Sequence, residues 1–182
     1  MISWFVAIDE RFALWIQAHV HNSVLDIIFP KLTVLGEVGM IWIVIGLLML
    51  AFKKTRKWGI VLLLVLALEG ICNELVLKNI VQRTRPCLDY PHISMLVSIP
   101  DSYSFPSGHA ASSFACATVL YRCHKKWGIV ALVFAAILAF SRIYLFVHYP
   151  FDVLAGTVLG ILLAVLVCAV LKKAKQLPPR LA

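Results

Sequence analysis

KNIVQRTRPCLDYPHISMLVSIPDSYSFPSGH, residues 78–109, is a long polar stretch between two hydrophobic blocks. It begins with Lys78, has an Arg-Pro pair at 85–86, and ends with Pro-Ser-Gly-His at 106–109. A second, shorter polar segment lies downstream at 141–152. We expect the two segments to meet in space, and the rest of the chain to hold them together.

The composition around these segments is that of a membrane protein. The chain has 182 residues, of which 62% are hydrophobic and 14% charged, and the mean hydropathy is +0.91. Soluble domains contain about 45–50% apolar and about 25% charged residues. A soluble domain of this length could not bury so much apolar surface, so the sequence predicts an all-α integral membrane protein.

The basic residues show which side of the membrane each loop faces. The formal net charge is +8, and most of the basic residues fall in three clusters at 53–57, 122–126 and 172–180. All three lie at the ends of apolar blocks, which is the bias of cytoplasmic loops and indicates anionic lipid headgroups as partners, with no nucleic acid and no obligate protein partner. We therefore predict a multi-pass protein of the plasma or inner membrane. Its C-terminus would be cytoplasmic and its active site would lie on the outer side.

The N-terminal segment predicts a helix of a different kind. Apolar side chains recur at helical spacing between residues 3 and 19: Trp4, Phe5, Ile8, Phe12, Trp15 and Ile16. The charged run at 9–11 argues against a lipid-exposed span, so an amphipathic helix in the interface is expected, with a first spanning helix as the alternative. We accordingly divide the chain into an interfacial helix, 1–22, and a membrane domain, 23–182, with its core at 58–171.

The membrane domain is expected to be one bundle of five or six spanning helices. Residues 38–52 are uncharged but too short to cross a membrane alone. This span is therefore expected to include part of the preceding segment, where Pro30 to Glu37 suggest a kink. Further spans are expected at 58–77, 127–147 and 151–171. A shorter helix is predicted over 106–121, capped by Ser104, and it would place His109 below the headgroups.

Three short elements carry chemistry. Lys78 and Arg85 would share one face of a helix that ends at Pro86, and Glu74 is expected to pair with Lys78 rather than to act as a catalyst. Pro-Ser-Gly-His at 106–109 would place free amides at a helix start, which suits an anion. Taken alone, the first element is better explained as a lipid-headgroup anchor, and the second as an ordinary capped helix start with a satisfied histidine.

The third element combines Ser141-Arg142 with His148 and Asp152. The spacing of four residues, or a turn around Pro150, lets the carboxylate reach the histidine. A carboxylate on one ring nitrogen fixes the tautomer and leaves the other nitrogen free to attack. A purely structural His–Asp pair is the alternative.

Together the elements read Lys-x6-Arg-Pro, Pro-Ser-Gly-His and Ser-Arg-x5-His-x3-Asp, all on one predicted membrane side. This combination resembles the type 2 phosphatidic acid phosphatase and vanadium haloperoxidase superfamily, over roughly residues 58–171. The small size and the segment Asn22-Ser23-x-Leu25-Asp26 are similar to bacterial undecaprenyl-diphosphatases. The resemblance implies a membrane-embedded lipid phosphatase.

The resemblance also implies a phosphate-binding cradle. Lys78, Arg85 and Arg142 would bind the non-bridging oxygens, and Ser107 with the Gly108 amide would complete the cradle. Three cations of this kind supply the charge neutralisation that phosphoryl transfer requires. The outer loop holds only Asp89 and Asp101 as acids, without ligand spacing. No metal and no other cofactor are therefore expected.

The remaining roles implied by the resemblance are chemical. His148 would attack phosphorus and form a phosphohistidine, and Asp152 would orient its ring. His109 would protonate the leaving oxygen and then activate water. The leading substrate is undecaprenyl diphosphate, with phosphatidylglycerophosphate, phosphatidate and lipid A 1-phosphate as alternatives. A vanadate-dependent haloperoxidase, a transporter and an inactive lipid-binding module are the rival functions.

Overall fold

The computed structural model describes residues 2–181, without the side chains of Ile2, Ser3 and Phe5, so the Phe5 side chain of the predicted stripe lies outside the described part. The described residues form helices joined by loops, with no strand among them. The helices are α1 (Ile2–His19), α2 (Ser23–Leu35), η1 (Glu37–Gly39), α3 (Met40–Ala51), α4 (Arg56–Gly70), η2 (Ile71–Leu77), α5 (Lys78–Val81), α6 (Pro86–Asp89), α7 (Gly108–Cys123), α8 (Lys125–Tyr144) and α9 (Pro150–Lys173).

Several of these helices are long and apolar enough to cross a membrane. The segment Arg56–Asp89 and helices α8 and α9 each qualify, and α2 with η1 and α3 forms a fourth candidate, bent by 47°. The 24 residues of α9 span about 36 Å, more than the ~30 Å hydrocarbon core. The predicted all-α, multi-pass membrane fold is confirmed. The predicted count of five or six spans stays a prediction, because α7 has only 16 residues.

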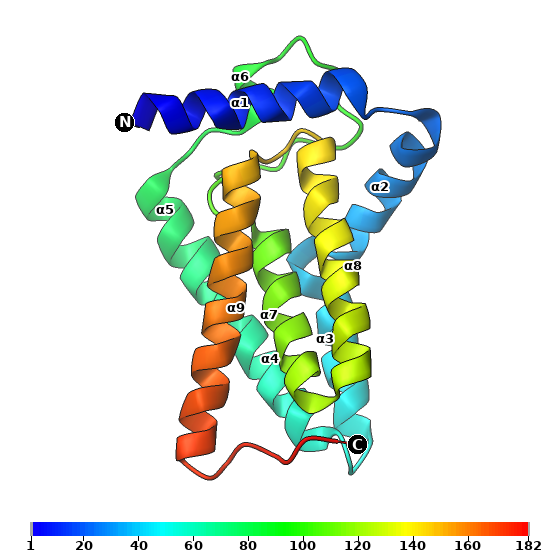
Figure 1. Ribbon diagram of the computed structural model, residues 1–182, viewed down its shortest axis with the longest axis vertical. Helices are drawn as coiled ribbons and strands as arrows, with labels where there is room; N and C mark the ends of the chain where they lie inside the picture. Colours follow the sequence, from blue (N-terminus) through cyan, green and yellow to red (C-terminus); the bar gives the residue numbers. More distant parts are fainter. Residues whose placement is uncertain (1, 182) are drawn as a thin grey trace.

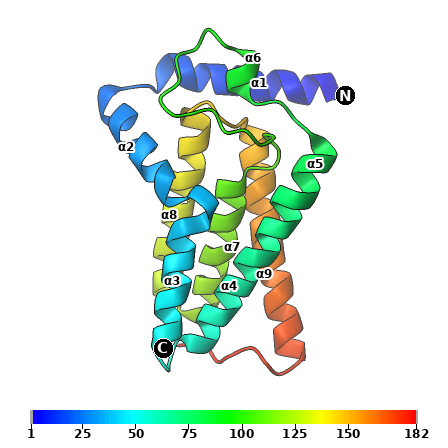
Figure 2. The same cartoon turned by 180° about the vertical axis from the view of Figure 1, so that it is seen from behind.

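Helix α7 runs through the middle of the bundle (Figures 1 and 2) and contacts α4, α8 and α9. Its buried face consists mainly of alanine and serine, and small residues let neighbouring backbones approach closely. On α9, Gly156 and Gly160 face it at very short range. An added Cβ at Gly160 would lie 2.2 Å from the Ala111 carbonyl oxygen. This close approach fixes the position of α7 along the bundle axis, and therefore the position of His109 in its first turn.

Replacing Gly160 with alanine is therefore expected to lower stability. Overpacking costs about 1–3 kcal/mol or more, and here it should exceed the gain of up to about 1 kcal/mol in helix propensity. The measurement is the midpoint of thermal unfolding in detergent. Gly70→Ala is the matched control, because nothing lies within 4 Å of an added Cβ there. Equal midpoints for the two variants would contradict the close-packing argument.

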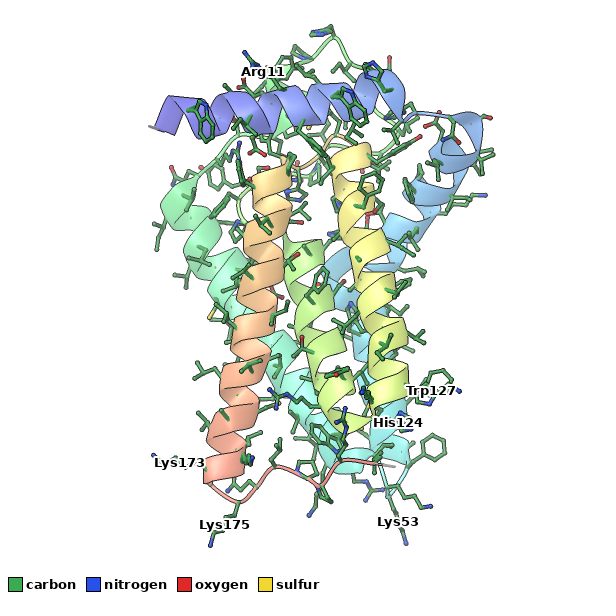
Figure 3. The ribbon with its side chains drawn as sticks, viewed as in Figure 1. Arg11, Lys53, His124, Trp127, Lys173 and Lys175 are labelled. Carbon is green, nitrogen blue, oxygen red and sulfur yellow. The ribbon has the colours of Figure 1, made fainter. Side chains whose placement is uncertain are left out.

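The two ends of the bundle differ in character. Helix α1 lies across one end, above the N-terminus of α9 and the C-terminus of α8 (Figure 1). Arg11 points away from the bundle at that end, whereas Lys53, Lys173 and Lys175 lie at the opposite end (Figure 3). Trp4, with 64% of its surface exposed, and the exposed Ile8, Phe12 and Trp15 form the outward apolar side of α1. Helix α1 is not among the candidate spans of the described residues, and an exposed apolar side of this kind is what the expected interfacial helix would present to lipid.

Two local predictions are wrong. The helix carrying Lys78 ends at Val81, where Gln82 adopts a left-handed conformation with φ 50°. Pro86 does not end that helix but begins α6, because its fixed φ suits a first helical position. Likewise, Ser104 does not cap α7, which starts at Gly108.

Candidate active site

A cavity of about 770 Å³ opens between α3, α4 and the N-terminal end of α7. Six of the eight predicted site residues line its polar end: Lys78, Arg85, Gly108, His109, Arg142 and His148. Mainly apolar residues line its other end, with Glu37 and Glu69 beside them: Val38, Ile43, Leu63, Leu66 and Ala67. The two polar segments of the sequence therefore meet, as predicted, and they meet beside an apolar space within the bundle.

The Ser102 hydroxyl joins the first two cations. Lys78 Nζ donates to Ser102 Oγ at 3.0 Å, and Arg85 Nη2 donates to the same oxygen at 3.1 Å. Lys78 also pairs with Glu74 at 2.8 Å, as its spacing predicted. Although Lys78 lies in α5 and Arg85 in the extended residue before α6, the loop at 100–104 brings their charges together. Both are almost fully buried, so an anion between them would meet little competing water.

The start of α7 supplies the uncharged part of the cradle. Ser107 is its N-cap residue, and its hydroxyl is buried without a hydrogen-bond partner among the described residues. An unpaired buried hydroxyl is costly unless a ligand satisfies it. At Gly108, an added Cβ would lie 2.6 Å from a carboxylate oxygen of Glu74, so only glycine fits there without rearrangement. The free amides of a helix start suit a phosphate oxygen.

The proposed nucleophile lies in the turn between α8 and α9. His148 Nδ1 is 3.7 Å from Asp152 Oδ2, and its Nε2 lies 3.2 Å from Arg85 Nη1. Pro150 begins α9, and Asp152 Oδ2 accepts from the Tyr149 amide at 2.9 Å, which closes a capping box. Of the two predicted geometries, the turn around Pro150 is the one present. Nδ1 therefore faces the carboxylate, and Nε2 faces the cations.

The electrostatic environment keeps His148 neutral. Burial, assisted by the charges of Arg85 and Arg142, lowers the pKa of His148 to about 3, against the opposing effect of Asp152. A ring with this pKa holds an unprotonated nitrogen throughout the physiological range, and only this form can attack phosphorus.

The other histidine is held by α2. His109 Nε2 lies 3.1 Å from the Thr33 carbonyl oxygen, and the Thr33 hydroxyl accepts a hydrogen bond from Arg142 Nη1. Thr33 thus positions both residues, and the Arg142 Nε remains buried without a partner in the described part of the chain. An added Cβ at Gly36 would lie 2.6 Å from the His109 ring, so the end of α2 packs directly against it.

Four residues near the site were not assigned from the sequence: Thr33, Arg83, Ser102 and Ser104. Ser104 donates to Asp152 Oδ2, and its oxygen lies 3.5 Å from His148 Nδ1. Arg83 pairs with Asp152 Oδ1 at 2.6 Å. Of these four, only Arg83 could have been suspected from the sequence, since it was one of the few basic residues outside the three clusters. The hydroxyl residues are too common in loops to stand out.

Comparisons with known proteins agree with this geometry. A family model described as the PAP2 superfamily matches residues 58–176. An undecaprenyl-diphosphatase of Sulfolobus acidocaldarius is 36% identical over 121 residues, which are 66% of this chain and 58% of that protein. A lipid A 4'-phosphatase of Bacteroides thetaiotaomicron is 30% identical over 175 residues, 88% of this chain and 75% of that protein.

A solved structure extends the likeness to nearly the whole fold. The crystal structure of a transmembrane PAP2-type phosphatidylglycerolphosphate phosphatase from Bacillus subtilis matches with a TM-score of 0.78 and 29% identity. The match covers 96% of this chain and 89% of that one.

Proposed function

The chain belongs to the PAP2 superfamily, and we propose that it is an integral-membrane phosphatase of lipid phosphates and diphosphates. In this proposal residues 23–182 form the phosphatase domain and 1–22 the interfacial helix. The basic loops contact anionic lipids on the cytoplasmic side of the plasma or inner membrane, and the active site lies on the outer side.

The observation that carries the proposal is the mixed lining of the cavity. Its polar end holds the cations and both histidines, and its apolar end lies between α3 and α4. A soluble phosphate ester would have no use for the apolar end. A lipid phosphate fits both, with its headgroup at Arg85 and Arg142 and its first isoprenoid or acyl carbons along Ile43 and Leu66.

The cradle binds the phosphoryl group before any bond changes. Lys78, Arg85 and Arg142 neutralise its non-bridging oxygens, while the Ser107 hydroxyl and the Gly108 amide donate to them. Donors fixed before the reaction stabilise the charge that develops in the transition state. Because the cations supply the neutralisation, the mechanism needs no metal ion.

The chemistry then proceeds in two displacements. His148 Nε2 attacks the terminal phosphorus, the bond from it to the oxygen of the leaving lipid alcohol or lipid phosphate breaks, and His109 gives its proton to that oxygen. His109 next takes a proton from water, the water oxygen attacks the phosphohistidine, and the P–N bond breaks to release phosphate. Asp152 holds the ring of His148 and stabilises the charge that it carries as a phosphohistidine.

Undecaprenyl diphosphate is the leading substrate. The undecaprenyl-diphosphatase relative supports it, but other relatives are named for a lipid A phosphate and a phosphatidylglycerol phosphate. The segment at residues 22–26 adds no support. Asn22 caps α2, and Asp26 accepts a hydrogen bond from the Tyr144 hydroxyl at 2.6 Å, so both have structural roles.

The purified protein is expected to release phosphate from undecaprenyl diphosphate faster than from phosphatidate, phosphatidylglycerophosphate or lipid A 1-phosphate, all in detergent micelles. EDTA is expected to leave the rate unchanged. Inactivation by EDTA would contradict the metal-free mechanism, and a faster rate on another lipid would replace the leading substrate. If no lipid phosphate is hydrolysed, bromide oxidation with added vanadate would indicate a haloperoxidase instead.

A further inference from the structure

One guanidinium group outside the cradle connects the site to α1. Arg83 lies in the extended segment between α5 and α6, and its two terminal nitrogens contact different carboxylates. Nη1 contacts Asp152 Oδ1 at 2.6 Å, and Nη2 contacts Asp9 Oδ2 at 2.6 Å. Its central carbon lies 4.2 Å from the centre of the Tyr149 ring. Two ion pairs and a ring contact leave this side chain little freedom.

The contact with Asp152 has a consequence for the nucleophile. Oδ1 of Asp152 is occupied by Arg83, so Oδ2 is the oxygen turned toward His148 Nδ1, Ser104 and the Tyr149 amide. A carboxylate can rotate about its terminal bond unless both oxygens are held. The guanidinium thus fixes the rotation of the group that orients His148.

The second partner of Arg83 is Asp9, a carboxylate that a helix lying in the membrane interface would otherwise leave exposed. Asp9 is 1% exposed and lies on the bundle-facing side of α1 with Ala13 and Ile16. Its Oδ1 accepts from the Phe151 amide at 2.8 Å, in the first turn of α9. A buried carboxylate is retained only where it is paired, and these two contacts are the pairing.

We propose that Asp9 and Arg83 are positioning residues, which act through Asp152 to hold His148 in line for attack and so tie the interfacial helix to the active site. The inference rests on the proposed function, because it assigns the residues to that reaction. Neither residue lines the cavity, and neither belongs to the three motifs. Their effect on the substrate is therefore indirect.

The inference predicts that loss of Arg83 lowers kcat without weakening the binding of phosphate. Lys78, Arg85 and Arg142 form the cradle without Arg83, so loss of Arg83 should leave phosphate affinity intact. Loss of Arg83 should disturb the orientation of His148, and a misplacement of about 1 Å can lower the rate about 10²-fold. Asp9 acts only by holding Arg83, so its effect should vanish when Arg83 is absent.

The test compares Arg83→Gln, Arg83→Lys, Asp9→Asn and the double variant with the wild-type protein in detergent. Farnesyl diphosphate is the probe for kcat and KM, and competitive inhibition by inorganic phosphate reports on the cradle. Asp9→Asn removes the charge but keeps an oxygen for the Phe151 amide. The matched control is Arg11→Gln. Arg11 lies on α1, two residues after Asp9, but it points away from the bundle (Figure 3).

Arg83→Gln is expected to lower kcat by about 10²-fold, with KM and the phosphate inhibition constant changed by no more than about threefold. Asp9→Asn should lower kcat less, and the double variant should match Arg83→Gln alone, because both act along one chain of contacts. Arg83→Lys should have a higher kcat than Arg83→Gln, since lysine keeps the charge but cannot pair with two carboxylates through two separate nitrogens. Arg11→Gln should behave as wild type.

Three results would overturn the inference while the wild-type protein remains active. An unchanged kcat in Arg83→Gln would remove the positioning role. An equal loss of phosphate affinity would make Arg83 a direct ligand of the substrate, and multiplicative effects in the double variant would show that Asp9 acts independently. If the wild-type protein hydrolyses neither farnesyl diphosphate nor any lipid phosphate, the proposed function fails, and the inference fails with it.

Discussion

His148→Ala is expected to lower lipid phosphate hydrolysis by roughly 10⁴-fold or more, the scale on which enzymes lose activity when the nucleophile of a covalent mechanism is removed. The physical reason is that His148 presents a neutral ring nitrogen, Nε2, directly beside the cations of the cradle. The three cations carry no lone pair for attack, and His109 faces Thr33 from another helix. Phosphate binding should survive, because the cradle does not include His148.

The measurement is steady-state phosphate release together with a rapid-quench search for a phosphoenzyme under alkaline conditions. The wild-type protein should form an alkali-stable phosphoenzyme, and His148→Ala should form none. His19→Ala serves as the control, because this histidine is exposed on α1 and its hydrogen bond and ring contact are with Trp15 of the same helix. A variant that keeps a hundredth of the wild-type rate, or still forms the phosphoenzyme, would move the nucleophile to another residue.

The site was predictable where its chemistry resides in single residues at fixed spacing. Lys78, Arg85, His109, Arg142 and His148 are cations or histidines beside apolar segments, where they are costly and stand out. The alternation of basic clusters placed them on one membrane side, and the structure brings them to one cavity.

The positioning chain could not be predicted in the same way. Arg83 meets partners 74 residues earlier, at Asp9, and 69 residues later, at Asp152. No local spacing links them, and a single arginine two residues before an Arg-Pro pair has many possible partners. The charged run at 9–11 indicated that α1 does not span the membrane. It could not reveal that Asp9 turns inward, because the direction of a side chain depends on what the helix packs against.

The errors at Pro86 and Ser104 have a shared physical cause. Proline is compatible both with the residue after a helix and with the first turn of the next one. Only the left-handed conformation of Gln82, which ends α5 before the proline is reached, decides between them. Ser104 had the chemistry of a cap, but α7 begins only at Gly108 with Ser107 as its N-cap residue, so Ser104 lies before the helix and donates its hydroxyl to Asp152.

The second large effect is expected for His109→Gln, and it should depend on the leaving group. Loss of a general acid or base typically costs about 10²–10⁴-fold, so hydrolysis of a lipid phosphate with a strongly basic alkoxide leaving group should fall by that factor. Glutamine can still donate to the Thr33 carbonyl oxygen, as His109 Nε2 does, but it cannot transfer a proton. The variant thus keeps the contact and removes only the chemistry.

With p-nitrophenyl phosphate, whose leaving group needs no proton, the first displacement in His109→Gln should remain fast while the second stays slow. Water still requires a base to attack the phosphohistidine, so rapid-quench kinetics should show a burst of nitrophenol close to one per enzyme, followed by slow turnover. The phosphoenzyme on His148 should accumulate, in contrast to His148→Ala, which should show neither burst nor intermediate. The absence of a burst in His109→Gln would place His109 in substrate binding, and an unchanged turnover rate would remove it from the reaction. A retained burst with p-nitrophenyl phosphate, combined with a slowed first displacement with the lipid phosphate, is the result expected of a residue that acts in both half-reactions.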